Sequence, residues 1–98
     1  MKNSITSPNF AINPVTKIED AMSVGKELKN ALEVRVVAEN YLKSSQLFTA
    51  SSNGKTKYAI EIKNKKLLQF KGFMNGKPVD TDLDEVTAAL VAHAIIDA

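Results

Sequence analysis

Apolar residues recur at intervals of three and four over residues 17–43, and this spacing places them on one side of a helix. They are Ile18, Ala21, Met22, Leu28, Ala31, Leu32, Ala38 and Leu42. Thr16 and Glu19 have the spacing of a capping box, which favours a helix start at this point. The pattern predicts one long helix, in which Gly25 marks a bend or a close contact with another helix. The β-branched alternation over residues 31–38 would also suit a strand, but we expect helix there.

The period of the apolar residues changes to two after Ser45, which is typical of strands with one buried face. Asn53-Gly54 and Asn75-Gly76 are strong hairpin signals, because a type I′ turn needs positive φ at both central residues. Asn64-Lys65 is a weaker signal of the same kind. These turns predict a three- to four-stranded antiparallel meander with strands at 46–52, 56–63 and 66–74 and a short stub at 77–79.

Apolar and polar side chains alternate along the second and third of these strands. The apolar set Tyr58, Ile60, Ile62, Leu68 and Phe70 alternates with Lys57, Glu61, Lys63, Gln69 and Lys71. This predicts an apolar face and a solvated face. Thr81 then precedes three acidic residues, which favours a second helix with Thr81 as its cap, and an apolar stripe carries this helix to the end of the chain. The expected fold class is α+β, with both helices packed on the apolar face of the sheet.

Residues 1–14 show no helical period and contain two prolines, so we expect an extended N-terminal arm ahead of a single α+β domain over residues 15–98. Phe10 and Ile12 would dock this arm either on its own domain or on a neighbouring subunit. No apolar run has the form of a signal peptide or the length of a membrane span, so we expect no membrane association.

The composition is that of an ordinary globular domain, since 44% of the 98 residues are apolar and 24% are charged. Cysteine is absent, which excludes a disulfide framework and a thiolate nucleophile and favours a reducing cytosol. Lysine outnumbers arginine by 12 to one, and Asn and Ile are frequent. This usage is typical of A/T-rich coding sequences, which are common in low-G+C bacteria and in bacteriophages. Short proteins without motifs from such sources are often accessory or inhibitory factors.

Few residues offer catalytic or metal-binding chemistry. His93 is the single histidine, so histidine-based metal clusters are excluded, and we expect it to be partly buried near a helix C-terminus. Asp80, Asp82 and Asp84 alternate as in a calcium loop, but the glycine and glutamate that such a loop needs are missing, so helix capping explains them better. The four glycines are isolated, which excludes a glycine-rich phosphate loop. We therefore expect no catalytic residue, no metal or cofactor, and no enzyme activity.

Lysines are concentrated between residues 55 and 77, where seven of them accompany a single acid, Glu61. We expect Lys57, Lys63 and Lys71 on the solvated face of the sheet. The other four, at strand ends, are Lys55, Lys65, Lys66 and Lys77, and Phe73 is expected beside the lysines. Such a positive plate suits nucleic-acid phosphates or an acidic protein surface. Lysines more often solubilise an exposed sheet and protect its edges, and this explanation stays open beside the binding one.

A second candidate surface is apolar. Val34, Val37 and Tyr41 lie off the main stripe of the first helix, so this helix and the arm present more apolar surface than one small sheet covers, unless the second helix covers it. A protein partner or a homodimer is the expected use. We expect a non-enzymatic protein-binding module of the cytoplasm, such as a phage or mobile-element inhibitor or regulator of a host protein complex that acts in the host cytoplasm. The alternative is a nucleic-acid-binding protein that uses the lysines of residues 55–77.

Overall fold

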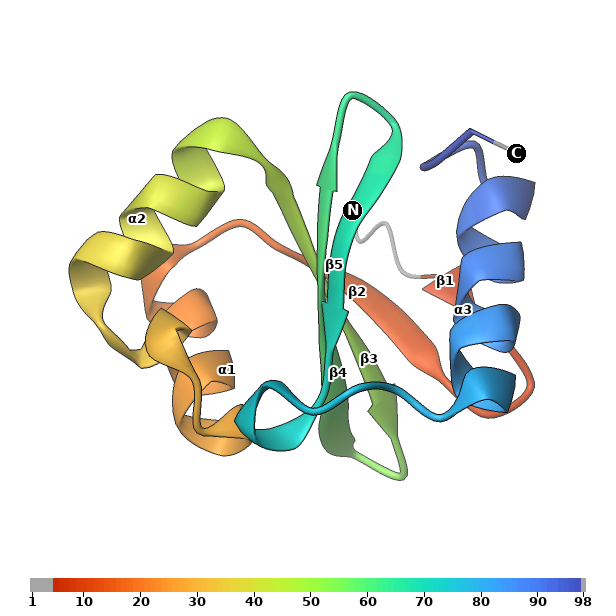
Figure 1. The fold of residues 1–98 in the computed structure, drawn as a ribbon, viewed down its shortest axis with the longest axis horizontal. Helices are drawn as coiled ribbons and strands as arrows, with labels where there is room; N and C mark the ends of the chain where they lie inside the picture. Colours follow the sequence, from red (N-terminus) through yellow and green to blue (C-terminus); the bar gives the residue numbers. More distant parts are fainter. Residues whose placement is uncertain (1–4, 98) are drawn as a thin grey trace.

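A five-stranded antiparallel sheet runs through the middle of the molecule and separates two layers of helices (Figure 1). The computed structural model describes residues 5–97. The strands pair in chain order and are β1 (Ile5–Thr6), β2 (Ala11–Val15), β3 (Gln46–Ser52), β4 (Lys55–Lys63) and β5 (Lys66–Lys71). The helices are α1 (Ile18–Leu28), α2 (Arg35–Ser44) and α3 (Asp80–Ala92), with 3₁₀ turns η1 (Ala31–Glu33) and η2 (Phe73–Asn75). The predicted α+β class is confirmed, and the sheet is larger than predicted.

Apolar side chains cover both faces of the sheet, so the molecule has two cores. On one face, Ile60 and Ile62 of β4 pack with α3. On the other, Leu47 and Ala59 pack with α1 and α2. The helical layers therefore lie on opposite faces (Figure 1), and the prediction that both pack on one face is wrong. The reason is visible in β3, where residues 47–50 are buried without interruption, as in a strand that is covered on both sides.

The predicted long helix is divided into α1, η1 and α2. Lys29 adopts a left-handed conformation (φ 53°) at the end of α1, and η1 packs back on α1. Gly25 permits this approach, because a Cβ there would lie 2.0 Å from the backbone N of Glu33. Gly25 thus marks a close contact, and most of residues 31–38 is helical. The predicted capping box does not form, since Lys17 is the N-cap and makes no side-chain cap hydrogen bond.

Two of the three predicted turns connect strands as expected. Asn53 and Gly54 have φ values of 55° and 77° between β3 and β4. Asn64 and Lys65 have φ values of 53° and 62° between β4 and β5. Positive φ at both central residues is the requirement of a type I′ turn, so these local signals predicted the hairpins correctly.

The hairpin predicted at Asn75-Gly76 is replaced by the η2 turn. Positive φ falls on Met74 (54°) and Asn75 (61°), whereas Gly76 has a φ of −68°. The chain then crosses to α3 on the other side of the sheet (Figure 1), and residues 77–79 do not form the predicted strand. Pro78 has no N–H group, so a strand here would lack one of its ladder hydrogen bonds.

A β-bulge changes which residues of β5 face the core. Glu61 pairs with Gln69 and Ile62 pairs with Leu67, so Leu68 is the extra residue. Leu68 is 51% exposed, whereas Leu67 packs against the α3-side core. The predicted inward position of Leu68 is wrong, because a regular alternation does not continue through a bulge.

The N-terminal segment is part of the sheet through β1 and β2. Phe10 and Ile12 are buried in the α3-side core, so they dock on their own domain and offer no surface to a partner. Residues 1–4 of the predicted arm lie outside the described residues. Within residues 5–97, no helix combines the length and the apolar character that crossing a membrane requires.

Helix α3 differs at both ends from the predicted second helix. Val79 is its N-cap, so Thr81 lies inside the helix and does not cap it. Beyond the helix, Ala94 adopts a left-handed conformation (φ 58°), and Ile96 packs back into the core. The apolar stripe near the chain end therefore reflects a turn that folds onto the sheet, and the helix does not continue to the last residue.

A carboxylate on α3 fixes the β1–β2 turn to the helix. Glu85 accepts hydrogen bonds from Ser7 Oγ and, at 2.7 Å each, from the backbone N and the Nδ2 of Asn9. These bonds favour the charged carboxylate and hold the pKa of Glu85 below its ordinary value of 4.5, with the Ser7 bond as the largest cause. Because the folded pKa is the lower one, this stabilisation is present above the ordinary value and is lost as the pH falls through the folded pKa.

Replacing Glu85 with Gln should therefore lower stability at neutral pH, and its effect should become smaller as the pH falls and the wild-type carboxyl takes up its proton. Urea midpoints of both proteins at about pH 7 and about pH 2 would measure this. Asp84→Asn removes the neighbouring carboxylate and serves as the control. An equal difference between wild type and Glu85→Gln at both pH values would contradict an ionic origin.

Candidate functional site

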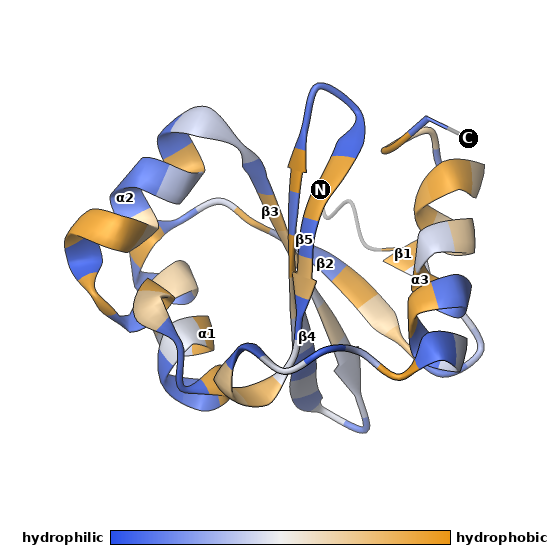
Figure 2. Cartoon of the chain, in the orientation of Figure 1, coloured by the Kyte–Doolittle hydropathy of each residue, from blue (hydrophilic) through white to orange (hydrophobic). Residues whose placement is uncertain are grey.

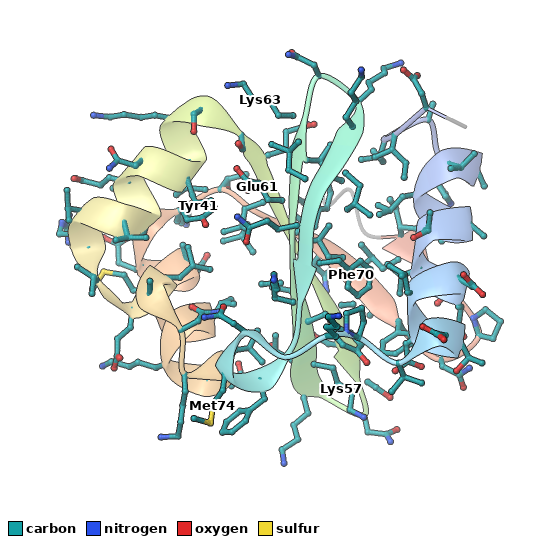
Figure 3. The ribbon with its side chains drawn as sticks, in the orientation of Figure 1. Tyr41, Lys57, Glu61, Lys63, Phe70 and Met74 are labelled. Atoms are coloured by element: carbon teal, nitrogen blue, oxygen red, sulfur yellow. The ribbon has the colours of Figure 1, made fainter. Side chains whose placement is uncertain are left out.

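The seven lysines between residues 55 and 77 are divided among separate parts of the surface. Lys63, Lys65 and Lys66 surround the β4–β5 turn. Figure 2 shows this turn as hydrophilic. Figure 3 shows Lys63 and Lys57 at opposite ends of the sheet. Lys57 and Lys63 are six residues apart along β4, which corresponds to a separation of about 20 Å between their Cα atoms. The lysines therefore do not form the continuous plate that the strand pattern predicted, and helices α1 and α2 cover part of that face.

A groove of about 480 Å³ lies between the start of β4, the end of α1 and the η2 turn. Lys55, Lys57 and Lys77 line it together with Phe73. We term this hollow the basic groove. These four residues are one part of the predicted binding surface that the structure brings together.

The remaining wall of the basic groove is largely neutral. Leu28 of α1 and Tyr58 of β4 are buried residues in this wall. Glu27 is the single acid among the lining residues, and its Oε2 accepts a hydrogen bond from Thr56 N at 3.2 Å. Because one carboxylate accompanies three ammonium groups, the groove has an excess of positive charge and suits an acidic ligand.

Tyr58 connects the basic groove to the segment that leads into α3. Its hydroxyl donates a hydrogen bond to Asp82 Oδ2 at 2.6 Å and accepts one from Val79 N at 3.4 Å. Burial raises the pKa of Tyr58 above its ordinary value of 10.0, and the hydrogen bond to Asp82 raises it further. The hydroxyl is therefore protonated at neutral pH, and its partners give it a structural role.

The η2 turn presents two exposed apolar side chains beside the basic groove. Phe73 is 55% exposed and Met74 is 65% exposed, and we term this pair the apolar tip. Three backbone hydrogen bonds of 2.8 to 3.1 Å within residues 72–76 hold the turn. The left-handed backbone of Met74 costs a non-glycine residue about 1 kcal/mol or more. The turn therefore presents both side chains of the apolar tip to solvent on a strained, hydrogen-bonded backbone.

The other predicted site residues lie away from the basic groove. Lys71 and Tyr41 line a second hollow, of about 310 Å³, to which Asn75 of η2 also contributes. Val34 is exposed and Val37 is half-buried at the start of α2. Helix α3 does not cover these valines, because it lies on the opposite face of the sheet (Figure 1). The η2 turn therefore stands between two hollows, each with part of the predicted residues.

The residues considered for metal or acid–base chemistry occupy helix ends. His93 is the C-cap of α3 and is exposed, so the predicted partial burial is wrong. Its exposure follows from the chain reversal at Ala94, which turns the following residues to the sheet and leaves the cap in solvent. Asp80 lies in the first turn of α3, where a carboxylate complements the helix dipole.

Sequence reasoning did not identify Met74, Glu27 or Leu28 as site residues. The signal for Met74 was the apolar pair Phe73-Met74 directly before Asn75-Gly76, which was interpreted as the end of a strand. Glu27 and Leu28 lie on another element, and the packing of α1 against β4 and η2 brings them to the groove. No local pattern reports such a contact.

In comparisons with known proteins, the chain matches no family model, no curated protein and no solved structure.

Proposed function

We propose that this chain is a non-enzymatic protein-binding module that acts by occupying its partner. The observation that carries the proposal is the exposed pair Phe73 and Met74 on a hydrogen-bonded turn beside the basic groove. The backbone hydrogen bonds already hold the turn in place, so its backbone loses little conformational entropy on binding. A few anchor side chains supply most of the energy of a protein interface, and the polar residues around them exclude water.

The chemistry of the site defines the kind of partner. Phe73 and Met74 fit an apolar pocket, and the flexible thioether of methionine adapts to an irregular one. Lys55, Lys57 and Lys77 then face carboxylates at the rim of that pocket. Such rim charges increase the association rate and select the partner more than they add affinity. The proposed partner surface is therefore an apolar pocket bordered by acidic residues.

Inhibition or regulation is the role that fits binding by occupancy, because a bound module excludes competing ligands from the covered surface. The Lys-, Asn- and Ile-rich composition supports a phage or mobile-element source, with a host protein complex as the target and the host cytoplasm as the compartment. A second copy of the chain is the other protein partner that the apolar tip could bind, as a homodimer.

A nucleic-acid ligand is the second candidate, because Phe73 lies beside three lysines and an aromatic ring can stack on a base. The other four lysines lie outside the basic groove. Contacts to about three phosphates of a single strand would give a slope of log affinity against log salt of about −2. This slope is the property that distinguishes a nucleic-acid interface from the proposed protein interface.

The proposal is tested by affinity capture from a lysate of the source cells with tagged wild-type protein, with and without nuclease. We expect a dominant nuclease-resistant protein at fixed stoichiometry. The Phe73→Ser/Met74→Ser double variant should bind this protein at least about tenfold more weakly, because interface anchors are worth about 2 kcal/mol or more each. The control Leu68→Ser removes a similarly exposed apolar side chain from β5 and should retain it.

Retention of the captured protein by the double variant would contradict the apolar tip as the contact surface, and so would equal loss by the Leu68→Ser control. Captured material that disappears with nuclease and weakens linearly with log salt would support the nucleic-acid candidate. A second copy of the chain as the retained protein would identify the homodimer.

A further inference from the structure

The second hollow, of about 310 Å³, lies between the α1–η1–α2 layer and the edge of the sheet. On this face α1 packs against β4 and α2 packs against β3. The edge strand β5 also lines the hollow, through Gln69 and Lys71. Its floor is apolar and fixed, because Leu32, Leu47 and Ala59 are buried members of the core on this face. A volume of this size is at the small end of the range for small-molecule sites.

Two opposite charges line the hollow. The register pairs Glu61 with Gln69 and Ala59 with Lys71, so Glu61 and Lys71 occupy diagonal positions on the same face of β4 and β5. Side chains in this diagonal arrangement have Cα atoms about 7–8 Å apart. Both residues are partly shielded from water, which makes each charge costlier to leave uncompensated.

The two charges do not neutralise each other. Within residues 5–97 the single ion pair within 4.0 Å joins Arg35 to Glu39 on α2. Glu61 instead accepts a hydrogen bond from Ser45 Oγ at 2.6 Å, which holds the carboxylate in place. In the described part of the chain, the Lys71 ammonium has no hydrogen-bond or ion-pair partner. The hollow therefore presents a carboxylate that can bind a cationic group and, at a separate point, an ammonium that can bind an anionic group.

Neutral polar groups complete the lining. Gln69 Nε2 donates a hydrogen bond to the hydroxyl of Tyr41 at 3.2 Å. Figure 3 shows Tyr41 and Glu61 in the space between α2 and the sheet. The Tyr41 O–H and the carbonyl oxygen of Gln69 are then directional groups that can bind a ligand. An apolar floor with a few polar groups of fixed position is the usual construction of a small-molecule site.

We propose that this hollow binds a free amino acid with an apolar side chain. The ligand ammonium lies on the Glu61 carboxylate, its carboxylate on the Lys71 ammonium, and its side chain on Leu32 and Ala59. A neutral ligand would bring no opposite charge to Glu61 or to Lys71, and a ligand with one charge would pair with only one of them. A small zwitterion satisfies both. This inference goes beyond the proposed function, because no residue of the apolar tip takes part.

Titration of the purified full chain with L-leucine tests the proposal, with amide NMR spectra as the readout. We expect saturable shifts confined to the neighbourhood of the hollow, at Ala59, Glu61, Gln69 and Lys71. N-acetyl-L-leucine has no ammonium and L-leucine amide has no carboxylate. Each should bind at least about tenfold more weakly than L-leucine. Titration up to about 10 mM detects affinities in the millimolar range.

Two variants assign the ends of the ligand. In Lys71→Met, leucine and leucine amide should bind equally, because the partner of the carboxylate has been removed. In Glu61→Gln, leucine and N-acetyl-leucine should bind equally, because the partner of the ligand ammonium has been removed. Lys63→Met removes an exposed lysine outside the hollow and should leave the binding of all three compounds unchanged.

Three results would overturn the proposal. One is the absence of saturable shifts with leucine, valine, methionine and phenylalanine up to about 10 mM. Another is equal binding of leucine and its two derivatives by the wild type, which would mean that the charges play no part. The third is saturable shifts that map to the basic groove. Amide spectra of each variant that match the dispersion of the wild type show that the fold is retained.

Discussion

Replacing Gly25 with alanine is expected to lower the free energy of unfolding by about 3 kcal/mol or more. In an ordinary helix the same change raises stability by about 1 kcal/mol, because alanine has the higher helix propensity. Here the added Cβ would lie 2.0 Å from Glu33 N and 2.4 Å from Leu32 C. Both atoms belong to the backbone, so no side-chain rotation relieves the overlap. Helix α1 and the η1 turn must separate, and the floor of the second hollow moves with them.

The comparison with Ser23→Ala isolates this effect, because Ser23 is an exposed residue of the same helix. Urea unfolding of the two variants and the wild type gives the difference. We expect Ser23→Ala to be as stable as the wild type or slightly more stable. An insoluble Gly25→Ala protein beside a soluble Ser23→Ala protein would be the same result in its extreme form. A Gly25→Ala variant with unchanged or higher stability would contradict the close packing of η1 on α1.

The elements that the sequence predicted correctly are those with local causes. Asn53-Gly54 forms a hairpin because two adjacent residues can both adopt positive φ, and nothing distant is needed. The signal at Asn75-Gly76 is equally strong, yet the chain there forms η2 and leaves the sheet. A turn dipeptide specifies a reversal, but whether a strand follows depends on whether the next segment can pair. Pro78 and the start of α3 prevent this.

The arrangement of the helices depended on small side chains. Ala59 has the same parity along its strand as Lys57 and Glu61, which alternation placed on the solvated face. It is buried under α1 and α2, because its short side chain lets a helical layer approach the sheet. An alanine in a strand is compatible with either solvent or a second core, so alternation alone does not distinguish a two-layer from a three-layer arrangement. The adjacent apolar residues Leu47 and Phe48, both buried in the structure, were the stronger indication in the sequence.

The candidate site was predictable only in part for the same reason. Lysine frequency and the position of Phe73 identified four residues that meet in the basic groove. The pairing of Glu61 with Gln69, and hence the diagonal of Glu61 and Lys71, depends on the register beside a bulge. The Tyr41 side of the second hollow depends on the break after α1. Both are consequences of packing between distant segments, which no local pattern contains.

Replacing Leu90 with alanine is expected to lower the free energy of unfolding by about 3 kcal/mol. Leu90 is fully buried on α3 and belongs to the core that Ile60 and Ile62 form on that face of the sheet. The loss is a large share of the roughly 5–15 kcal/mol that stabilises a domain of this size. The matched control is Leu68→Ala, which removes the same atoms from a side chain that is 51% exposed and should cost much less.

This variant also tests whether the two cores unfold together. Strand β4 contributes Ile60 to one core and Ala59 to the other, so damage to the α3 side should destabilise both. The chain has no tryptophan and two tyrosines, with Tyr58 in the α3-side core and Tyr41 packed against the other. Tyrosine fluorescence of Leu90→Ala in a Tyr41→Phe background and in a Tyr58→Phe background therefore follows each core separately.

We expect the two single-tyrosine proteins to show the same loss of stability on Leu90→Ala, each measured against its own background without that substitution. Coincident losses would mean that the sheet transmits the damage from one layer to the other. A loss seen by Tyr58 alone would mean that α3 detaches while α1, α2 and the sheet remain folded. That outcome would contradict a single cooperative unit and would make α3 an independent layer, whose release exposes the apolar face that Ile60 and Ile62 form.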